Sequence, residues 1–231
     1  SGSANFGVVP IENSTEGVVS NTLDNFIDSP LRVCGEVSLR IHHHLLGTAG
    51  ALSDVKRVYS HQQSLAQCRN WLALNLPDVE QVSVSSNAEA ARRAAEEPGN
   101  AAIAGLQASE LYELKSLASN IEDNPNNTTR FLIIGKLETR ATGEDKTSIM
   151  VSSRNEAGAL YNLLAPIAQH KVSMSKIESR PSNRGLWEYV FFLDLDGHID
   201  NPEISAVLDE IKQQAVTLKL LGSYPKSVLD L

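Results

Sequence analysis

The sequence is poor in several features that mark common classes of protein. It has no Lys- or Arg-rich stretch, and its 20 basic residues are outnumbered by 28 acidic ones, which gives a formal net charge of −8. This charge disfavours nonspecific attraction to nucleic acid or anionic lipid, so an anionic substrate has to be held by a few placed donors. The apolar runs are far too short to span a bilayer. We therefore expect small-molecule chemistry, with no nucleic-acid partner and no membrane partner.

Cysteine is also scarce. Cys34 and Cys68 form neither a CxxC motif nor a disulfide framework, which fits a reducing compartment. The first six residues lack the basic and apolar regions of a signal peptide. Together these features predict a cytoplasmic location. Paired carboxylates and a nucleophile elbow are missing as well, so the sequence gives little support to a hydrolase.

What the chain does have is a hydrophobic content of 42% with alternating apolar patterns, enough for a folded core. Its 231 residues correspond to about 1.5 nominal domains. Up to residue 135, short apolar runs alternate with helical patterns, which predicts an α/β domain with a largely parallel sheet. Strands are predicted at residues 6–11, 31–41, 58–60, 80–84, 101–104 and 130–135. Helices are predicted around residues 18–27, 65–76 and 87–97, the last with Asn87 as its N-cap.

A polar segment at residues 137–146 reads as a linker, and the pattern changes after it. Strands are predicted at residues 147–153, 172–180, 187–195 and 216–224, with helices at residues 156–170 and 202–215. The order is βαββαβ. It predicts a ferredoxin-like module in which two helices cover one face of a four-stranded sheet.

Three consecutive histidines, His42, His43 and His44, are the first candidates for a metal site. In a strand His42 and His44 would share one face, but no nearby Cys or carboxylate pair completes a set of usual zinc spacing. We favour the simpler interpretation, a strand end near the surface with one imidazole hydrogen-bonded in a cleft, and expect no metal.

Polar residues also gather at three predicted strand ends. The segment 59–63 (Tyr-Ser-His-Gln-Gln) joins a strand to a helix, where free N–H groups can bind an anion, although Ser60 could simply cap that helix. Residues 10–15 and 126–131 also place hydrogen-bonding side chains at a predicted strand end. Amides and hydroxyls at strand ends are commonly turn formers. Together the three segments predict one cleft lined by neutral donors.

The second half contains two further segments of interest. Residues 155–160 open a helix directly after a strand, and small residues there allow close approach of a bound carboxylate or amine. Residues 178–181 end the strand that follows. For these segments taken alone, we favour the simpler interpretation of a helix start packed tightly on the sheet.

Taken in order, these segments resemble prephenate dehydratase with a C-terminal ACT regulatory domain. The matching segments are residues 7–14 (Gly-Val-Val-Pro-Ile-Glu-Asn-Ser), 59–61 (Tyr-Ser-His), 67–68 (Gln-Cys), 127–131 (Asn-Thr-Thr-Arg-Phe), 158–160 (Gly-Ala-Leu) and 178–181 (Glu-Ser-Arg-Pro). The resemblance implies a two-lobed dehydratase fold similar to periplasmic binding proteins at residues 1–136, a linker at 137–146 and an ACT domain at 147–231. It also implies conversion of prephenate to phenylpyruvate without a cofactor, feedback inhibition by L-phenylalanine, and a homodimer or homotetramer.

The resemblance assigns roles to individual residues. Thr129 is expected to donate a hydrogen bond or proton to the leaving ring hydroxyl. The residues expected to bind substrate are Asn13, Ser60, Gln67, Asn127, Arg130 and Phe131. The residues expected to bind phenylalanine between ACT domains are Gly158, Ala159, Leu160, Glu178, Ser179, Arg180 and Pro181.

The chain departs from the family pattern at its beginning, because it has no Gly-rich segment of the kind with which the dehydratase domain opens. We expect either a fragment of a longer protein, with an upstream chorismate mutase domain as one form of it, or a lobe completed in some other way. The rival functional hypotheses are an amino-acid-binding module without catalysis and a purely structural domain.

Overall fold

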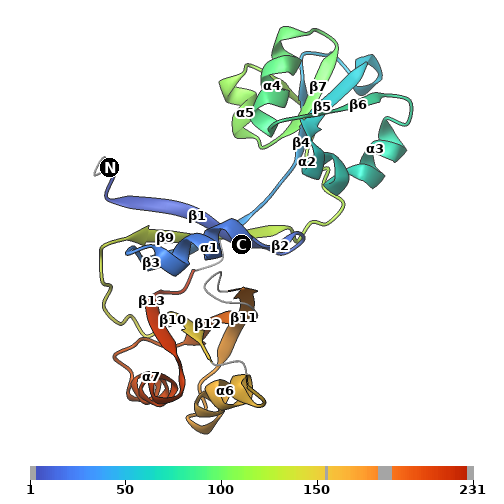
Figure 1. The fold of residues 1–231 in the computed structure, drawn as a ribbon. Coiled ribbons are helices and arrows are strands. Elements are labelled where there is room, and N and C mark those ends of the chain that lie inside the picture. Colours follow the sequence, from blue (N-terminus) through green and yellow to red (C-terminus); the bar gives the residue numbers. More distant parts are fainter. Residues whose placement is uncertain (1–3, 154–155, 182–188, 228–231) are drawn as a thin grey trace. The chain divides into compact units, whose positions relative to one another are not determined.

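A computed structural model describes residues 4–153, 156–181 and 189–227. The chain forms two compact units (Figure 1). One unit, here the first unit, holds the chain up to Leu39 and from Thr129 onward. The second unit is Arg40–Thr128. Each unit has its own sheets and hydrophobic core.

The second unit is built on a five-stranded sheet in the order β6-β5-β7-β4-β8 (Figure 1). Its strands are β4 (His44–Gly47), β5 (Arg57–His61), β6 (Glu80–Val84), β7 (Asn100–Ala104) and β8 (Lys115–Ala118). The expected largely parallel sheet is wrong here: β5 runs parallel to β6 and β7, whereas β4 runs antiparallel to β7 and β8. Strands β4 and β8 were not predicted, because each has four residues and no β-branched side chain.

Helices and a short 3₁₀ turn surround this sheet. They are η1 (Leu52–Asp54), α2 (Gln62–Gln67), α3 (Arg69–Asn75), α4 (Asn87–Glu96) and α5 (Gln107–Leu111). The helix predicted around 65–76 is broken at Cys68 into α2 and α3, and Cys68 and Leu72 are buried on its predicted apolar face. Helix α4 is capped by Ser86, whose side chain accepts from the Glu89 N–H, and not by Asn87 as predicted.

The first unit begins with a four-stranded sheet in the order β2-β1-β9-β3, which we call the dehydratase sheet from the family resemblance. It contains β1 (Phe6–Asn13), β2 (Gly17–Val18), β3 (Arg32–Arg40) and β9 (Thr128–Gly135), with helix α1 (Ser20–Asp28) beside it. All of these except the two-residue β2 were predicted, within a few residues. Strands β1 and β9 pair antiparallel although they are more than a hundred residues apart.

The rest of the first unit has the predicted βαββαβ order. Its elements are β10 (Asp145–Ser152), α6 (Ala159–Gln169), β11 (Met174–Pro181), β12 (Tyr189–Asp196), α7 (Pro202–Gln214) and β13 (Thr217–Pro225). The antiparallel sheet has the order β11-β12-β10-β13, and α6 and α7 lie together against one face of it (Figure 1). The first two residues of the strand predicted at 187–195 lie outside the described residues.

The other face of this sheet packs on the dehydratase sheet through one shared core. Its buried residues are Ile11, Leu23, Phe26, Val33 and Leu132 from the first part, and Met150, Val190, Phe192, Leu221 and Tyr224 from the second. The backbones approach so closely that a Cβ placed on Gly222 would lie 2.0 Å from the carbonyl oxygen of Val33. Glycine is therefore required at 222 by space.

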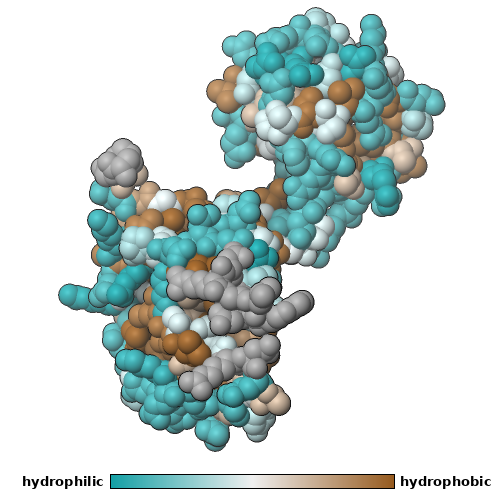
Figure 2. Space-filling model, in the orientation of Figure 1, coloured by the Kyte–Doolittle hydropathy of each residue, from teal (hydrophilic) through white to brown (hydrophobic). Residues whose placement is uncertain are grey.

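The drawn face of each unit is mainly hydrophilic, with smaller hydrophobic patches among the hydrophilic residues (Figure 2). Phe6 and Val8 on β1 are more than half exposed. None of the helices described here is long and apolar enough to cross a membrane.

Candidate functional site

Asn13 and Thr129 meet across strands β1 and β9. The Asn13 Nδ2 donates to Thr129 Oγ1 over 2.8 Å, while the Asn13 Oδ1 accepts from the backbone N–H groups of Thr15 and Glu16. The amide is therefore held at both ends in one orientation. Within the described residues, the Thr129 hydroxyl has no acceptor for its own proton. The pair thus presents an oriented hydroxyl that can donate one hydrogen bond.

A bulge in β1 brings these two side chains together. Pro10 lies opposite Phe131, but Glu12 lies opposite Arg130, so Ile11 is an extra residue on the β1 side. Without the bulge, Asn13 would lie one residue out of register with Thr129. Bulges re-aim side chains in this way, and they are common beside active sites.

Alternation along β9 separates the motif residues onto two faces of the sheet. Thr129 and the half-buried Phe131 share one face, while Arg130 shares the other with buried Leu132. Sequence reasoning assigned Thr129, Arg130 and Phe131 to one substrate site. The structure keeps Thr129 and Phe131 on the face that carries Asn13 and turns Arg130 toward the antiparallel sheet β11-β12-β10-β13.

The Arg130 guanidinium is surrounded by acceptors in that direction. It lies 2.6 Å from the Glu36 carboxylate, 2.8 Å from Asp194, 3.0 Å from Glu12 and 3.1 Å from the Tyr224 hydroxyl. Burial lowers the pKa of Arg130, but Asp194, Tyr224 and Glu36 raise it by more, so the guanidinium stays charged. This arrangement favours a structural role for Arg130 over direct contact with a ligand.

Two lysines complete the ion-pair network. Lys146 contacts both Glu36 carboxylate oxygens at 3.1 Å, and Lys176 contacts Glu12. Burial would raise the pKa of the Glu36 carboxyl, but nearby Arg130 and Lys146 bring it below its usual value. The network therefore contains three cations and three carboxylates, Arg130, Lys146 and Lys176 against Glu12, Glu36 and Asp194, whose formal charges cancel.

In the second unit, two of the predicted site residues, Gln67 and Asn127, are hydrogen-bonded to each other. His43 is hydrogen-bonded to the same Gln67 oxygen. The Gln67 Oε1 lies 3.2 Å from Asn127 Nδ2 and 2.7 Å from His43 Nε2. Asn127 and His43 are buried, whereas Gln67 is partly exposed. The simpler interpretation expected one hydrogen-bonded imidazole at a strand end near the surface. Two of the three are hydrogen-bonded, His43 to Gln67 and His42 to Glu122, and both His43 and His44 are buried.

Ser60 occupies a different environment from the one expected. It is fully buried at the end of β5, where its hydroxyl lies 2.9 Å from Asn87 Oδ1 and 2.8 Å from the Ile103 carbonyl oxygen. Ser60 is not the helix cap either, because the cap of α2 is the His61 side chain, which accepts from the Gln63 N–H. This geometry favours Ser60 as a support for the loop over a direct ligand contact.

The predicted effector segments lie at the start of α6 and along β11. Gly158 has a left-handed backbone with φ of 81°, a conformation that favours glycine, and Leu160 is partly exposed. Strand β11 is an edge strand of its sheet, with Ser179 and Pro181 exposed and Glu178 half-buried. Ala159 begins the helix itself.

Arg180 of the same segment is hydrogen-bonded to two side chains of helix α1. Its guanidinium donates to the Asp24 carboxylate at 2.8 and 3.0 Å and to Ser20 Oγ at 3.0 Å. The hydrogen bond to Asp24 raises the pKa of Arg180. Strand β11 is therefore tied to α1 through Arg180 and to β1 through Lys176.

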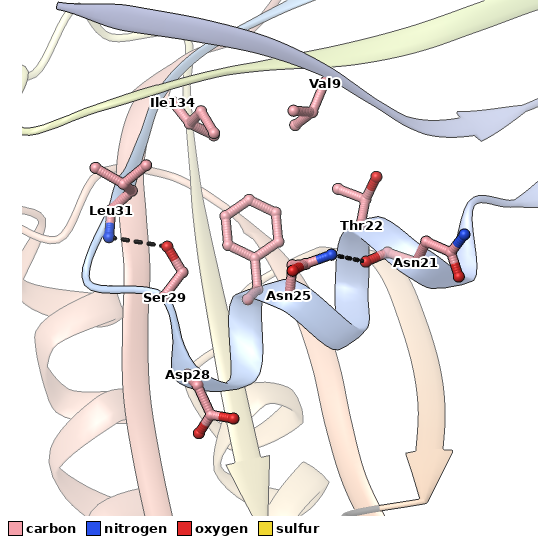
Figure 3. Close-up of a pocket in the computed structure, with 9 residues that line it drawn as sticks. Val9, Asn21, Thr22, Asn25, Asp28, Ser29, Leu31 and Ile134 are labelled. Atoms are coloured by element: carbon pink, nitrogen blue, oxygen red, sulfur yellow. Dashed lines mark hydrogen bonds between the residues drawn. The ribbon is translucent and has the colours of Figure 1, made fainter. Parts of the chain in front are cut away.

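A cavity of about 510 Å³ lies between α1 and the dehydratase sheet (Figure 3). Val9 and Ile134 line it from the sheet, and Asn21, Thr22 and Phe26 from the helix. Val9 and Ile134 belong to the face opposite Thr129, and no predicted site residue lines this cavity. Across the described ranges, no group of three or more His, Cys, Asp or Glu side chains is placed to hold a metal ion.

Comparison with known families accounts for both parts of the chain. The family described as prephenate dehydratase matches residues 1–139, and the ACT domain family matches residues 147–213. The chain belongs to the prephenate dehydratase family. The resemblance drawn from the sequence motifs is thus confirmed, as is the mixed α/β fold with its C-terminal ACT domain.

Individual relatives agree with this assignment. The bifunctional chorismate mutase/prephenate dehydratase of Pseudomonas aeruginosa is 56% identical over 229 residues, covering 99% of this chain and 63% of the relative. The structure of an Arthrobacter aurescens prephenate dehydratase in complex with L-Phe is 37% identical with a TM-score of 0.87, covering 96% of this chain and 75% of that one. A protein described as GqqA, a novel type of quorum quenching acylase, is 30% identical with a TM-score of 0.88, covering 97% and 83%. The chain thus spans just under two thirds of the length of the bifunctional relatives.

Proposed function

We propose that the protein converts prephenate to phenylpyruvate, with release of carbon dioxide and water. The observation that carries this proposal is the Asn13–Thr129 hydrogen bond, which orients the threonine hydroxyl and leaves its proton available. Family membership supplies the reaction.

The chemistry suits these groups. Breaking the bond to the ring carboxylate releases carbon dioxide, and its electron pair moves into the ring while the C–O bond of the ring hydroxyl breaks. The hydroxide takes up a proton and leaves as water. Because the product ring is aromatic, the step is strongly downhill, and the protein mainly has to position the substrate and assist the leaving group. A hydrogen bond from Thr129 that strengthens as the C–O bond breaks needs no matched pKa.

The remaining predicted residues receive more specific roles in this proposal. Asn13 and Gln67 are each assigned a direct substrate contact, and Asn127 and Phe131 keep the substrate-binding role that the family resemblance gives them. Ser60 and Arg130 are assigned supporting roles, because the one is buried and the other is held by carboxylates. No metal or organic cofactor is assigned.

Regulation by L-phenylalanine is the second part of the proposal. The Arthrobacter relative is a crystal structure in complex with L-Phe, this chain shares its fold, and residues 147–213 of this chain match the ACT domain family. We assign effector binding to Gly158, Ala159, Leu160, Glu178, Ser179 and Pro181, at an interface between ACT domains in a dimer or tetramer, with Arg180 holding β11 to the dehydratase part. Both cysteines are free thiols, and burial raises the pKa of Cys68 to about 12, which is consistent with an unreactive thiol in a cytoplasmic enzyme.

The test is turnover of prephenate by the purified gene product, followed as phenylpyruvate, with and without L-phenylalanine. Turnover that L-phenylalanine suppresses supports both parts of the proposal. Binding of L-phenylalanine by calorimetry without phenylpyruvate formation would support the non-catalytic binding module instead. An N-acyl amide serves as a counter-substrate, because one structural relative is described as an acylase.

A further inference from the structure

His43 is the buried neighbour of Gln67, and the proposed function gives it no task. Its ring Nε2 lies 2.7 Å from Gln67 Oε1, and Asn127 Nδ2 lies 3.2 Å from the same oxygen. An amide oxygen can only accept hydrogen bonds. Both neighbours must therefore donate, which places the proton of a neutral His43 on Nε2.

The opposite orientation of the Gln67 amide is disfavoured. It would place the Gln67 nitrogen 3.2 Å from Asn127 Nδ2, with donor facing donor. Turning both amides over would restore the bond between Asn127 and Gln67, but it would make His43 Nε2 an acceptor and move the ring proton to Nδ1, which is buried with no partner among the described residues. Two donors thus converge on one oxygen and set which end of the Gln67 amide faces inward.

The surroundings of His43 fix its backbone as well. The His43 N–H donates to Glu122 Oε2 over 2.9 Å, and the His43 carbonyl accepts from the Ile121 N–H. Burial would raise the pKa of Glu122, but the bonds from the His43 N–H and the His42 side chain bring it below its usual value. The carboxylate therefore stays ionised and holds the backbone on which the imidazole is mounted.

The second ring nitrogen supports the same tautomer. The His43 Nδ1 is buried and, within the described part of the chain, has no hydrogen-bond partner. A proton there would be a buried donor without an acceptor, and it would leave Nε2 facing the Gln67 oxygen with no proton between the two atoms. A ring that carries its proton on Nε2 satisfies the hydrogen bonds of the site best.

We propose that His43 is a positioning residue for the dehydratase reaction, which acts by donating from Nε2 to Gln67 and so fixing the amide that contacts the substrate. This inference rests on the proposed function, since it assigns a task through Gln67. It adds a residue outside the six segments that carry the family resemblance, and its role depends on a contact with Gln67, 24 residues away along the chain.

Wild-type turnover of prephenate is measured first, and its failure counts against the proposed function alone. The variants are then His43→Leu, which removes the donor, and His43→Gln, which returns an N–H near the position of Nε2. His44→Leu is the matched control, because His44 is also buried but makes no hydrogen bond to Gln67. We expect His43→Leu to lower kcat/KM roughly 10- to 100-fold, mainly through KM, because the substrate contact is misplaced. His43→Gln should recover most of this loss, and His44→Leu should stay within about threefold of wild type.

A double-mutant cycle with Gln67→Ala separates positioning from a general effect on folding. If His43 acts through Gln67, His43→Leu should cost less than about twofold once Gln67 is gone. Long-range ¹H–¹⁵N NMR of the wild-type protein, assigned with His43→Gln, should show a neutral Nε2–H ring and needs no leucine variant to fold. Additive losses in the cycle, no recovery by His43→Gln, or an Nδ1–H ring would each overturn the inference.

Discussion

Arg130 on β9 and Asp194 on β12 are joined by a hydrogen bond of 2.8 Å, with both side chains about nine-tenths buried. The strand that carries Thr129 is therefore tied to the ACT sheet by the residue that follows Thr129. Ser148 and Tyr224 extend the connection, since Ser148 Oγ lies within hydrogen-bonding distance of both Asp194 and the Tyr224 hydroxyl. Within the Thr-Arg-Phe motif, Arg130 thus holds the strand, while Thr129 lies on the opposite face of the sheet.

The first prediction concerns the hydroxyl of Thr129. Thr129→Ala should lower kcat by about 10²- to 10³-fold, the usual cost of removing one hydrogen-bond donor to a leaving or developing oxyanion. Thr129→Ser keeps the hydroxyl and should retain most of the activity. Steady-state kinetics give the answer, with circular dichroism to confirm folding. Wild-type turnover in a folded Thr129→Ala enzyme would contradict the catalytic assignment.

The second prediction concerns the Arg130 network. Arg130→Met leaves Glu36 and Asp194 buried without their main partner and should destabilise the protein by about 3–5 kcal/mol in urea unfolding. Arg32→Met, which removes an exposed pair with Glu138, should cost less than about 1 kcal/mol and is the control. If Arg130 binds substrate instead, its loss would raise KM while stability stays close to wild type.

The third prediction follows from the carboxylates of that network. Their attraction to Lys176, Arg130 and Lys146 lowers the pKa values of Glu12 and Glu36 below 4.5 despite burial. A carboxyl whose pKa is lower in the folded state stabilises the protein at pH values above its unfolded pKa, and the stabilisation disappears as the pH falls through the folded value. The free energy of unfolding should therefore decrease as the pH is lowered from about 4.5, and Arg130→Met should show a shallower decrease. If the free energy of unfolding of the wild type and of Arg130→Met decreased with the same slope, the acid sensitivity would arise from groups outside this network.

The fourth prediction concerns the effector. Ser179 is exposed on edge strand β11, opposite Phe191, so Ser179→Leu should weaken inhibition by L-phenylalanine about tenfold or more, with little change in basal turnover. Lys176→Met cuts the ion pair between β11 and Glu12, the neighbour of Asn13, and should leave L-phenylalanine binding intact while reducing inhibition. Calorimetry and inhibition curves on the same samples separate binding from its effect. Equal feedback sensitivity in Ser179→Leu would argue against the assigned effector site.

Local patterns in the sequence predicted most of the elements and missed how they combine. Helix α4 and the alternation in β11 follow from side-chain spacing alone. The Asn13–Thr129 pair does not, because its register depends on a bulge at Ile11 and on a pairing partner far along the chain. The same holds for Asn87, which was predicted as a helix cap but instead turns back to Ser60 and Ser64.

The sites illustrate the same limit. Motif order placed Arg130 beside Thr129, but only the alternation of a paired strand shows that the two side chains point to opposite faces. His43 drew attention as part of a histidine run that suggested metal. Its partner is an amide in α2, and sequence spacing carries no signal for that contact.

The close approach of Gly222 to Val33 has a consequence for protein engineering. Exchanging a regulatory domain between enzymes assumes that the domain folds independently of the rest of the chain. Here the face of the ACT sheet that lacks helices completes the interior of its neighbour, and even a methyl group at 222 would strike the opposing backbone. A chimaera with a foreign ACT domain should therefore fold only if the donor sheet brings a matching apolar face, a small residue at this crossing and a partner for Arg130.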